Sequence, residues 1–323
     1  MRLAIHVDQQ LSLEYNINTK IKDILSTITT FGFVTVETSP PSVVNKTMQA
    51  KQVQIMYAIQ HPSVKSINDI KFTLHATCTI PKRQCDIFIA GCIVFPNGKL
   101  IFVDNDNSIP VILNKDGTLD KEISCSPRDS LDVTCLDDTT VAVSTENGIE
   151  IINIDSTKTE RRIKTCSPCH GITHNNELLL WCEPERGIQT MKLSDGRVTT
   201  LVKQRSLSYN SYITQCGENI YHTNGDTSTV TCYTIQGETL WQYKDVSVLN
   251  DPWGVTADNN YNVYVTSHES HSLVVLEPDG RQGRQLISSD DGLQYPTGIY
   301  FDKSKCRLLV TNDNGTAFLH KLC

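Results

Sequence analysis

Short apolar segments typical of β-strands recur along this chain, and glycine-containing or polar turns separate them. Apolar runs of this length bounded by turn residues are what buried β-strands show. The pattern repeats around Cys92, Val133, Ile172, Ile213, Val255 and Ile299, at intervals of 41, 39, 41, 42 and 44 residues. A repeat of roughly forty residues that contains only strand patterns is typical of β-propeller blades, because helical repeats of that length would show a 3.6-residue period.

The clearest repeat begins at Asp251-Pro-Trp-Gly-Val and predicts four strands, the last of them at Arg284-Gln-Leu-Ile. Asp279-Gly280 marks the turn between its third and fourth strands, and Asp116-Gly117 stands at the equivalent turn of the first repeat. Aspartate followed by glycine is a strong hairpin signal, because glycine adopts the positive φ of a tight turn without strain. We therefore expect blades of four antiparallel strands.

The last repeat ends at Cys323 after only three predicted strands, so one strand is missing from the sixth blade. An open blade would leave an unpaired strand edge. The segment Lys71–Ile80 can supply the missing strand, because its apolar residues alternate strictly with polar ones: Phe72, Leu74, Ala76, Cys78 and Ile80. The fold class predicted for residues 69–323 is thus all-β, a six-bladed propeller closed by an N-terminal strand.

Residues 1–68 are too few for a domain of their own. A stripe of apolar residues predicts a short helix over Thr19–Thr30, with Gly32 as its cap, and Phe33–Glu37 has the pattern of a strand. Two prolines then end the strand, and the residues up to about 68 form a linker.

Composition places the chain among ordinary globular proteins, with 39% hydrophobic and 20% charged residues and a net charge of −7. That charge disfavours a protein whose main task is to grip a nucleic-acid backbone or an anionic membrane. No segment approaches the roughly 18 apolar residues of a spanning helix, and the first residues lack the apolar core of a secretory signal. We expect no membrane partner, a cytoplasmic location and free thiols at the 12 cysteines.

The blade sequences DPWGVTADNNYNVYVTSHESHSLVVLEPDG and YPTGIYFDKSKCRLLVTND resemble the NHL repeats at the C-terminus of tripartite-motif proteins. The stretch LSLEYNINTKIKDILSTITTFGFVTVE is similar to the segment that joins the coiled coil to the propeller in the invertebrate branch of that family. The resemblance implies an NHL-type propeller preceded by a remnant of the coiled-coil junction. Family members are typically ubiquitin ligases with RING and B-box zinc modules, and their propeller reads a protein substrate or RNA.

This chain departs from the family plan at its front, where His6 is the only cysteine or histidine before His61. The zinc ligands of a RING or B-box are therefore missing, and we expect neither intrinsic ligase activity nor a metal there. Two explanations stay open: a relative that binds without ubiquitylating, or a catalytic part encoded upstream.

Polar and aromatic residues gather in the loops that a propeller brings to one mouth of its central channel. These candidate ligand-binding residues are Asp104, Asp106, His170, Glu183, His222, Asn224, Asp226, Trp253, His268, His271, Asn312 and Asp313. An aromatic with convergent polar groups at a concave mouth favours a binding site, here one that selects a basic or polar peptide. The alternative is that each aspartate or asparagine only forms its turn.

Cys166-Ser-Pro-Cys169-His170 has the spacing of a c-type haem attachment site, and with His174 or Cys182 it offers zinc-ligand types. The motif falls at a blade boundary and lacks the second tight pair of a structural zinc module. We therefore expect no cofactor, no metal and no catalytic residue.

The sequence thus predicts a protein-interaction propeller, linked through its resemblance to ubiquitylation or innate immunity. One alternative is a reader of single-stranded RNA, for which the basic candidates are Lys158–Lys164, Lys203, Arg205, Arg281 and Arg284. The other is a metal-dependent hydrolase or lyase, which would need three or four mouth residues to converge on one ion. The oligomeric state is open.

Overall fold

The computed structural model describes strands at residues 3–7 and 9–13, and residues 66–82, 86–124, 130–175, 177–205 and 207–323. Contacts divide the chain into Met1–Ile59 and Gln60–Cys323. In the first unit, β1 (Leu3–Val7) and β2 (Gln9–Leu13) pair as an antiparallel hairpin. The helix and strand expected at residues 19–30 and 33–37 lie outside the described residues.

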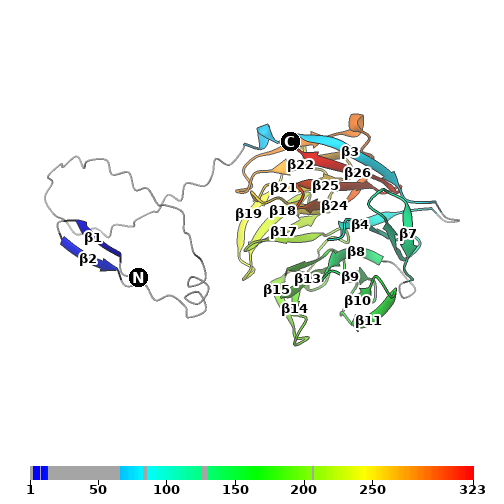
Figure 1. The fold of residues 1–323 in the computed structure, drawn as a ribbon, viewed down its shortest axis with the longest axis horizontal. Coiled ribbons are helices and arrows are strands. Elements are labelled where there is room, and N and C mark those ends of the chain that lie inside the picture. The colour runs from blue at the N-terminus through cyan, green and yellow to red at the C-terminus, as the bar shows by residue number, and fades with distance from the viewer. Residues whose placement is uncertain are drawn as a thin grey trace, which may run out of the picture. The chain divides into compact units, whose positions relative to one another are not determined.

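The second unit consists of six sheets, each of four antiparallel strands (Figure 1). The first blade holds β4 (Ile89–Val94), β5 (Leu100–Asp104), β6 (Ile109–Leu113) and β7 (Leu119–Glu122). The second holds β8 (Ser130–Cys135), β9 (Thr140–Thr145), β10 (Gly148–Asn153) and β11 (Lys158–Ile163). The third holds β12 (Ile172–Asn175), β13 (Leu178–Glu183), β14 (Gly187–Lys192) and β15 (Val198–Lys203). The fourth holds β16 (Ile213–Cys216), β17 (Asn219–Asn224), β18 (Thr229–Thr234) and β19 (Thr239–Tyr243). The fifth holds β20 (Pro252–Ala257), β21 (Val263–Ser267), β22 (Ser272–Leu276) and β23 (Gly283–Ile287). The sixth holds β24 (Pro296–Asp302), β25 (Arg307–Asn312), β26 (Thr316–Leu322) and β3 (Phe72–Thr79). Two short 3-10 helices, Ile67–Asp69 and Ser289–Asp291, complete the described elements of this unit.

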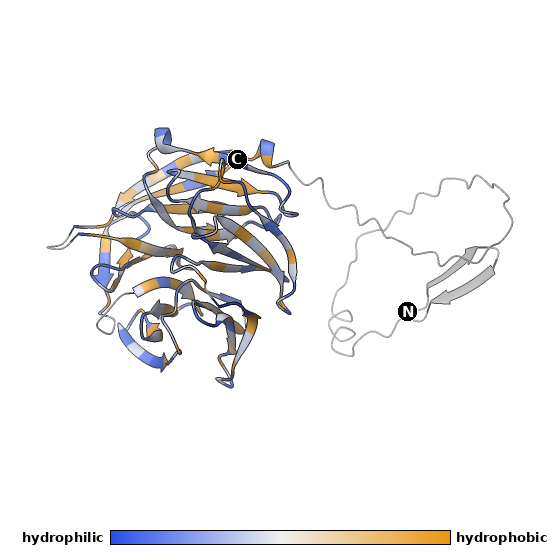
Figure 2. Ribbon diagram, turned by 180° about the vertical axis from the view of Figure 1, so that it is seen from behind, coloured by the Kyte–Doolittle hydropathy of each residue, from blue (hydrophilic) through white to orange (hydrophobic). Residues whose placement is uncertain are grey.

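The position of a strand within its blade determines how much of the strand is buried. The middle strands β21 and β22 are buried along their whole length, because neighbouring blades cover both faces of the sheet. Outer strands face water, and β11 is exposed at most of its positions. In Figure 2 the middle strands accordingly carry hydrophobic colouring, whereas β11 is mostly hydrophilic. The predicted turn glycines Gly117 and Gly280 have φ of 85° and 68°, as their tight turns require.

The ring closes as predicted, because β3 pairs with β26 from Phe72 opposite Leu322 to Thr79 opposite Thr316. Figure 1 shows β3 (cyan) running beside β26 (red). The expected alternation holds only in part, since Ile80 is buried but the Leu74 side chain is 56% exposed. Leu74 lies next to a register shift opposite the Leu319–His320 step, where the strand carries an extra residue.

The segment before β3 is fixed to the fifth blade by Arg284. Its guanidinium donates from Nε to the carbonyl of Ile67 at 2.8 Å and from Nη2 to that of Ile70 at 2.6 Å. Both isoleucines are buried in a cluster that also contains Leu273 and Leu308. The closing strand therefore enters the ring from an anchored position.

Two expectations from the sequence can be compared with the described residues. The cysteines that the structure describes are free thiols. Within the same residues, no helix is both long enough and apolar enough to span a membrane.

We predict that Arg284→Ala lowers the free energy of unfolding by about 1–3 kcal/mol, because two buried carbonyls lose a charged donor. Chemical denaturation of the full chain measures this. Arg281→Ala is the matched control, since its ion pair with Asp279 lies on the surface, and we expect a change below about 0.5 kcal/mol. Equal losses in the two variants would show that Arg284 does not anchor the closing strand.

Candidate functional site

The first strand of each blade lines the central channel, and neighbouring first strands approach each other closely. Four blades carry glycine just before their repeat anchor: Gly91, Gly171, Gly254 and Gly298. A Cβ on Gly171 would lie 2.4 Å from Cα of Tyr212, and one on Gly254 would lie 2.5 Å from the carbonyl oxygen of Thr297. The other two blades carry Asp132 and Tyr212 at this position.

Tyr212 crosses the channel. Its hydroxyl donates to the carbonyl of Ala90 at 2.8 Å, which joins the fourth blade to the first, on the opposite side of the ring. Only 9% of Tyr212 is exposed, and its side chain borders one cavity above and another below. The channel is therefore divided into an upper cavity of about 320 Å³ and a lower cavity of about 530 Å³.

The upper cavity opens on the face that we call the upper face, where the loops between second and third strands and the loops between blades emerge. Its walls come from five blades. They are Phe88, Ala90, Asn105, Leu131, Glu146, Pro168, His170, Gly171, Tyr209, Asn210, Tyr212 and Trp253.

Aromatic rings continue from this cavity across the upper face in an order we call the aromatic row: Phe88, Trp253, His268, Tyr295 and His271. Successive ring centroids lie 5.8, 4.6, 5.2 and 4.2 Å apart. Trp253 and His268 are stacked, with 12° between their planes, and the indole nitrogen donates to Asp251 Oδ2 at 3.0 Å. Packing and this hydrogen bond hold the row in a fixed conformation.

Backbone strain accompanies the aromatic row. Asp251, His271 and Tyr295 have positive φ values of 51°, 48° and 45°. Residues other than glycine reach this region at a cost of roughly 1–3 kcal/mol each. Such strain persists only where the surrounding structure enforces it, and Ser108 and Ser228 show it in the corresponding turns of other blades.

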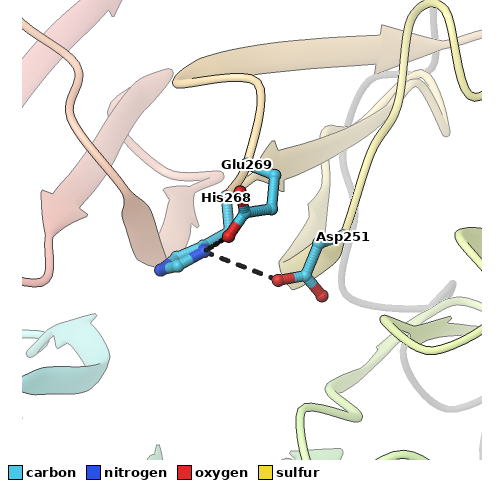
Figure 3. Close-up of side chains that lie close together, drawn as sticks. All are labelled: Asp251, His268 and Glu269. Atoms are coloured by element: carbon cyan, nitrogen blue, oxygen red, sulfur yellow. Dashed lines mark ion pairs between the residues drawn. The ribbon is translucent and has the colours of Figure 1, made fainter.

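Asp251, His268 and Glu269 form the one group of three metal-ligand types found among the described residues (Figure 3). The Nδ1 atom of His268 lies 3.5 Å from Asp251 Oδ2 and 3.6 Å from Glu269 Oε1. These atoms could ligate a divalent cation, or form an ion pair when the imidazole is protonated. Asp251 lies outside the residues that the sequence singled out.

Four of the predicted residues are buried and hydrogen-bonded within the protein: Asp104, Glu183, Asn224 and Asn312. Asp104 Oδ2 accepts from the side chain of Asn107 at 2.8 Å, and Glu183 Oε1 accepts from the indole of Trp181 at 2.8 Å. Asn224 accepts from the backbone of Thr227, and Asn312 accepts from that of Gln294. The turn-forming interpretation therefore describes Asp104, Asn224 and Asn312, whereas Glu183 bonds to Trp181 within its own strand.

The two buried histidines of the predicted set lie in different places. Burial lowers the pKa of His170 and of His222 to about 4, so both are neutral at pH 7. His170 lines the upper cavity and meets Tyr209 edge to face at 5.4 Å. His222 lies inside the fourth blade and borders neither cavity.

Three predicted aspartates lie in upper-face loops. Asp106 and Asp226 are exposed, and Asp226 accepts from the hydroxyl of Ser208 at 3.1 Å. Asp313 is half-buried; burial raises its pKa, and the nearby His268 and His271 oppose that rise. Of the predicted set, Trp253, His268 and His271 join the aromatic row, while His170 reaches the cavity.

Acidic side chains outnumber basic ones in the described part of the upper-face loops. The acidic residues are Asp86, Asp106, Glu146, Glu185, Asp226, Asp245, Asp251, Glu269, Asp290, Asp291 and Asp313. The basic residues are Lys82, Lys164, Arg186, Arg205 and Lys244. The face therefore attracts cationic partners and repels anionic ones.

The sequence did not single out four aromatic residues of the site. Phe88, Tyr209 and Tyr212 line the upper cavity, and Tyr295 belongs to the aromatic row. One signal was available, since Tyr212 stands where four other repeats have glycine. The remaining rings lie in loops of unequal length, which no repeat pattern aligns.

The Cys166-x-x-Cys169-His170 motif is split by burial. Cys169 is fully buried, which raises its pKa, and the neighbouring Cys182 adds to the rise. Cys166 is exposed, and the guanidinium of Arg186 lies 3.0 Å from its sulfur. Burial therefore disfavours the thiolate form of Cys169.

Asp132, at the second non-glycine position, borders the lower cavity. Its carboxylate accepts from the backbone N–H of Val133 at 2.8 Å and of Ile172 at 2.9 Å. Burial nevertheless raises its pKa to about 7, because desolvation outweighs the two hydrogen bonds that favour the charged form.

No family model matches the chain, and no curated protein matches it. Solved structures do share its fold. A Bacteroides thetaiotaomicron protein of unknown function aligns with a TM-score of 0.63 at 12% identity over 79% of this chain and 76% of its own. Virginiamycin B lyase from Staphylococcus aureus gives 0.59 at 15% identity over 78% of this chain and all of its own, and a nidogen/laminin complex gives 0.56 at 15% over 65% and 83%. At these identities the likeness shows the propeller fold alone.

We predict that the stability advantage of the wild type over Asp132→Asn shrinks as pH rises. The unfolded carboxyl loses its proton near pH 4 and the folded one near 7, so the folded state holds an extra proton between them. Its contribution to stability is therefore present at low pH and lost as pH rises through this window.

Denaturation of both proteins at pH 5 and pH 8 checks this, with an expected change in their difference of more than about 1 kcal/mol. His170 and His222 titrate in both proteins and cancel in the comparison. A difference that is constant with pH would contradict the raised pKa.

Proposed function

We propose that this chain is a protein-interaction platform whose upper face binds a basic or polar segment of a partner protein. The aromatic row at the mouth of the upper cavity is the observation that carries the proposal. Aromatic residues that combine apolar area with a polar group are enriched at the cores of protein interfaces. The acidic loops around them favour a partner of opposite charge.

Exposed apolar side chains on the same face add support. Tyr209 is 71% exposed, Val246 is 61% exposed and Tyr295 is 44% exposed, all in upper-face loops. One of the similar structures was solved as a complex between nidogen and laminin, so the fold is known in a protein assembly.

The RNA-reading alternative finds less support. Arg162 on β11 pairs with Glu150 at 3.2 Å, and Arg161 donates to the carbonyl of Leu193. Arg284 donates to two backbone carbonyls of the segment before β3. Phosphate binding needs several free cations on one face, and the upper face is acidic instead.

A narrower form of the proposal places the chain in a pathway. The resemblance of the blades to NHL repeats suggests a substrate-recognition propeller of the tripartite-motif kind, associated with ubiquitylation or innate immunity and acting in the cytoplasm. Free cysteines are in keeping with a reducing compartment. Ligase activity would then come from a RING protein to which this platform delivers its partner.

The metal-dependent enzyme is the second candidate, and the Asp251, His268 and Glu269 group favours it. Virginiamycin B lyase, one of the similar structures, shows that this architecture can carry lyase chemistry. A lyase or hydrolase of this kind needs its ion for activity. The purified protein would then contain the metal in a stoichiometric amount.

We predict that Tyr209→Ala reduces capture of protein partners from lysate severalfold, because an exposed ring is removed from the upper face. The full chain is immobilised and exposed to lysates with and without RNase, and the bound proteins are identified by mass spectrometry. Tyr261→Ala is the matched control, as Tyr261 is 40% exposed in a loop of the opposite face.

Partners that persist after RNase and depend on Tyr209 support the proposal. Bound material that disappears with RNase would assign the chain to RNA binding. Capture that is equal in both variants would place the interaction surface elsewhere.

A further inference from the structure

The upper cavity is closed at its base. Tyr212 lies across the channel and bonds to Ala90, so a side chain that enters from the upper face meets a floor. The volume of about 320 Å³ lies at the lower end of small-ligand pockets, which span roughly 300–1,000 Å³. This space suits one long side chain rather than a folded segment.

Aromatic rings form the walls of this closed cavity. Trp253 and Tyr212 lie nearly parallel, 25° and 6.2 Å apart, and Phe88 is tilted against the indole at 5.8 Å. Tyr209 lines the same cavity and meets His170 edge to face. Faces of aromatic rings attract cations within about 6 Å of their centroids, and tryptophan does so most strongly.

The described residues that line the cavity carry charge of one sign. Among the described residues around the cavity, Glu146 is the only one with a permanently charged side chain. His170 is neutral at pH 7, because burial lowers its pKa to about 4. A cation gains from Glu146 and from the rings, whereas an anion is repelled by both.

His170 also supplies an acceptor. The residue is 7% exposed, and its Nε2 atom has no hydrogen-bond partner among the described residues. The backbone of Tyr209 hydrogen-bonds to the same ring. A neutral imidazole that donates from its other nitrogen presents Nε2 as an acceptor, and a buried acceptor without a donor is costly. An ammonium or guanidinium N–H would satisfy it.

We infer that the upper cavity takes one lysine or arginine side chain of the partner protein, held between Trp253 and Tyr209 and paired with Glu146. This inference rests on the proposed function and adds the chemical group that the site selects. The aliphatic stem would lie along the rings, and the cationic head would reach Glu146 and His170 Nε2.

Titration of the full chain with N-acetyl-argininamide or N-acetyl-lysinamide tests the inference. Trp253 lines the cavity, so its fluorescence reports occupancy. N-acetyl-citrullinamide is the neutral isostere of the arginine probe. We expect at least one cation to bind about tenfold or more tightly than citrulline, because one charge-assisted contact changes affinity by that order.

Glu146→Gln should reduce binding of the cation about tenfold, whereas Glu185→Gln should leave it unchanged. Both glutamates are exposed in loops of the upper face, and only Glu146 borders the cavity. Equal binding of the cations and citrulline, or equal effects of the two variants, would overturn the inference. If protein capture still depends on Tyr209 in that case, the proposed function stands without the cation pocket. If the cation binds as expected but protein capture does not depend on Tyr209, the pocket stands and the proposed function is rejected.

Discussion

The pairing of β3 with β26 is the interaction on which the rest of this structure depends. Each blade buries its middle strands only between two neighbours, so a sixth blade of three strands would expose the side of the ring. The chain solves this with a strand drawn from far upstream, and Arg284 fixes the segment that precedes it. A closed ring in turn brings loops from all six blades to one face, which is the condition for any site at the channel mouth.

Inside the ring, the first strands approach so closely that glycine is required in four blades. The two exceptions give the channel its chemistry. Tyr212 converts an open channel into two cavities, and Asp132 places a carboxyl with a raised pKa in the lower one. The same packing constraint thus explains both the regularity of the repeat and the two positions at which this propeller acquires individual features.

The repeat period, the four-strand plan and the closing strand could all be predicted from the sequence. Each depends on local alternation, turn glycines and the need to cover strand edges, which are readable one segment at a time. Part of the candidate site was predictable for the same reason. Trp253, His268 and His271 stand at fixed places in the fifth repeat, and the structure places them together in the aromatic row.

The rest of the candidate site depends on distances across the ring, which the sequence does not show. The sequence determined the six-bladed propeller and which loops share a face. Only the tertiary structure decided that Asp104, Glu183, Asn224 and Asn312 are buried and hydrogen-bonded inside the protein. It also decided that Phe88, Tyr209 and Tyr212 line one cavity with Trp253. The physical reason is that strand periodicity sets the face of a residue, whereas loop conformation and ring closure set its neighbours.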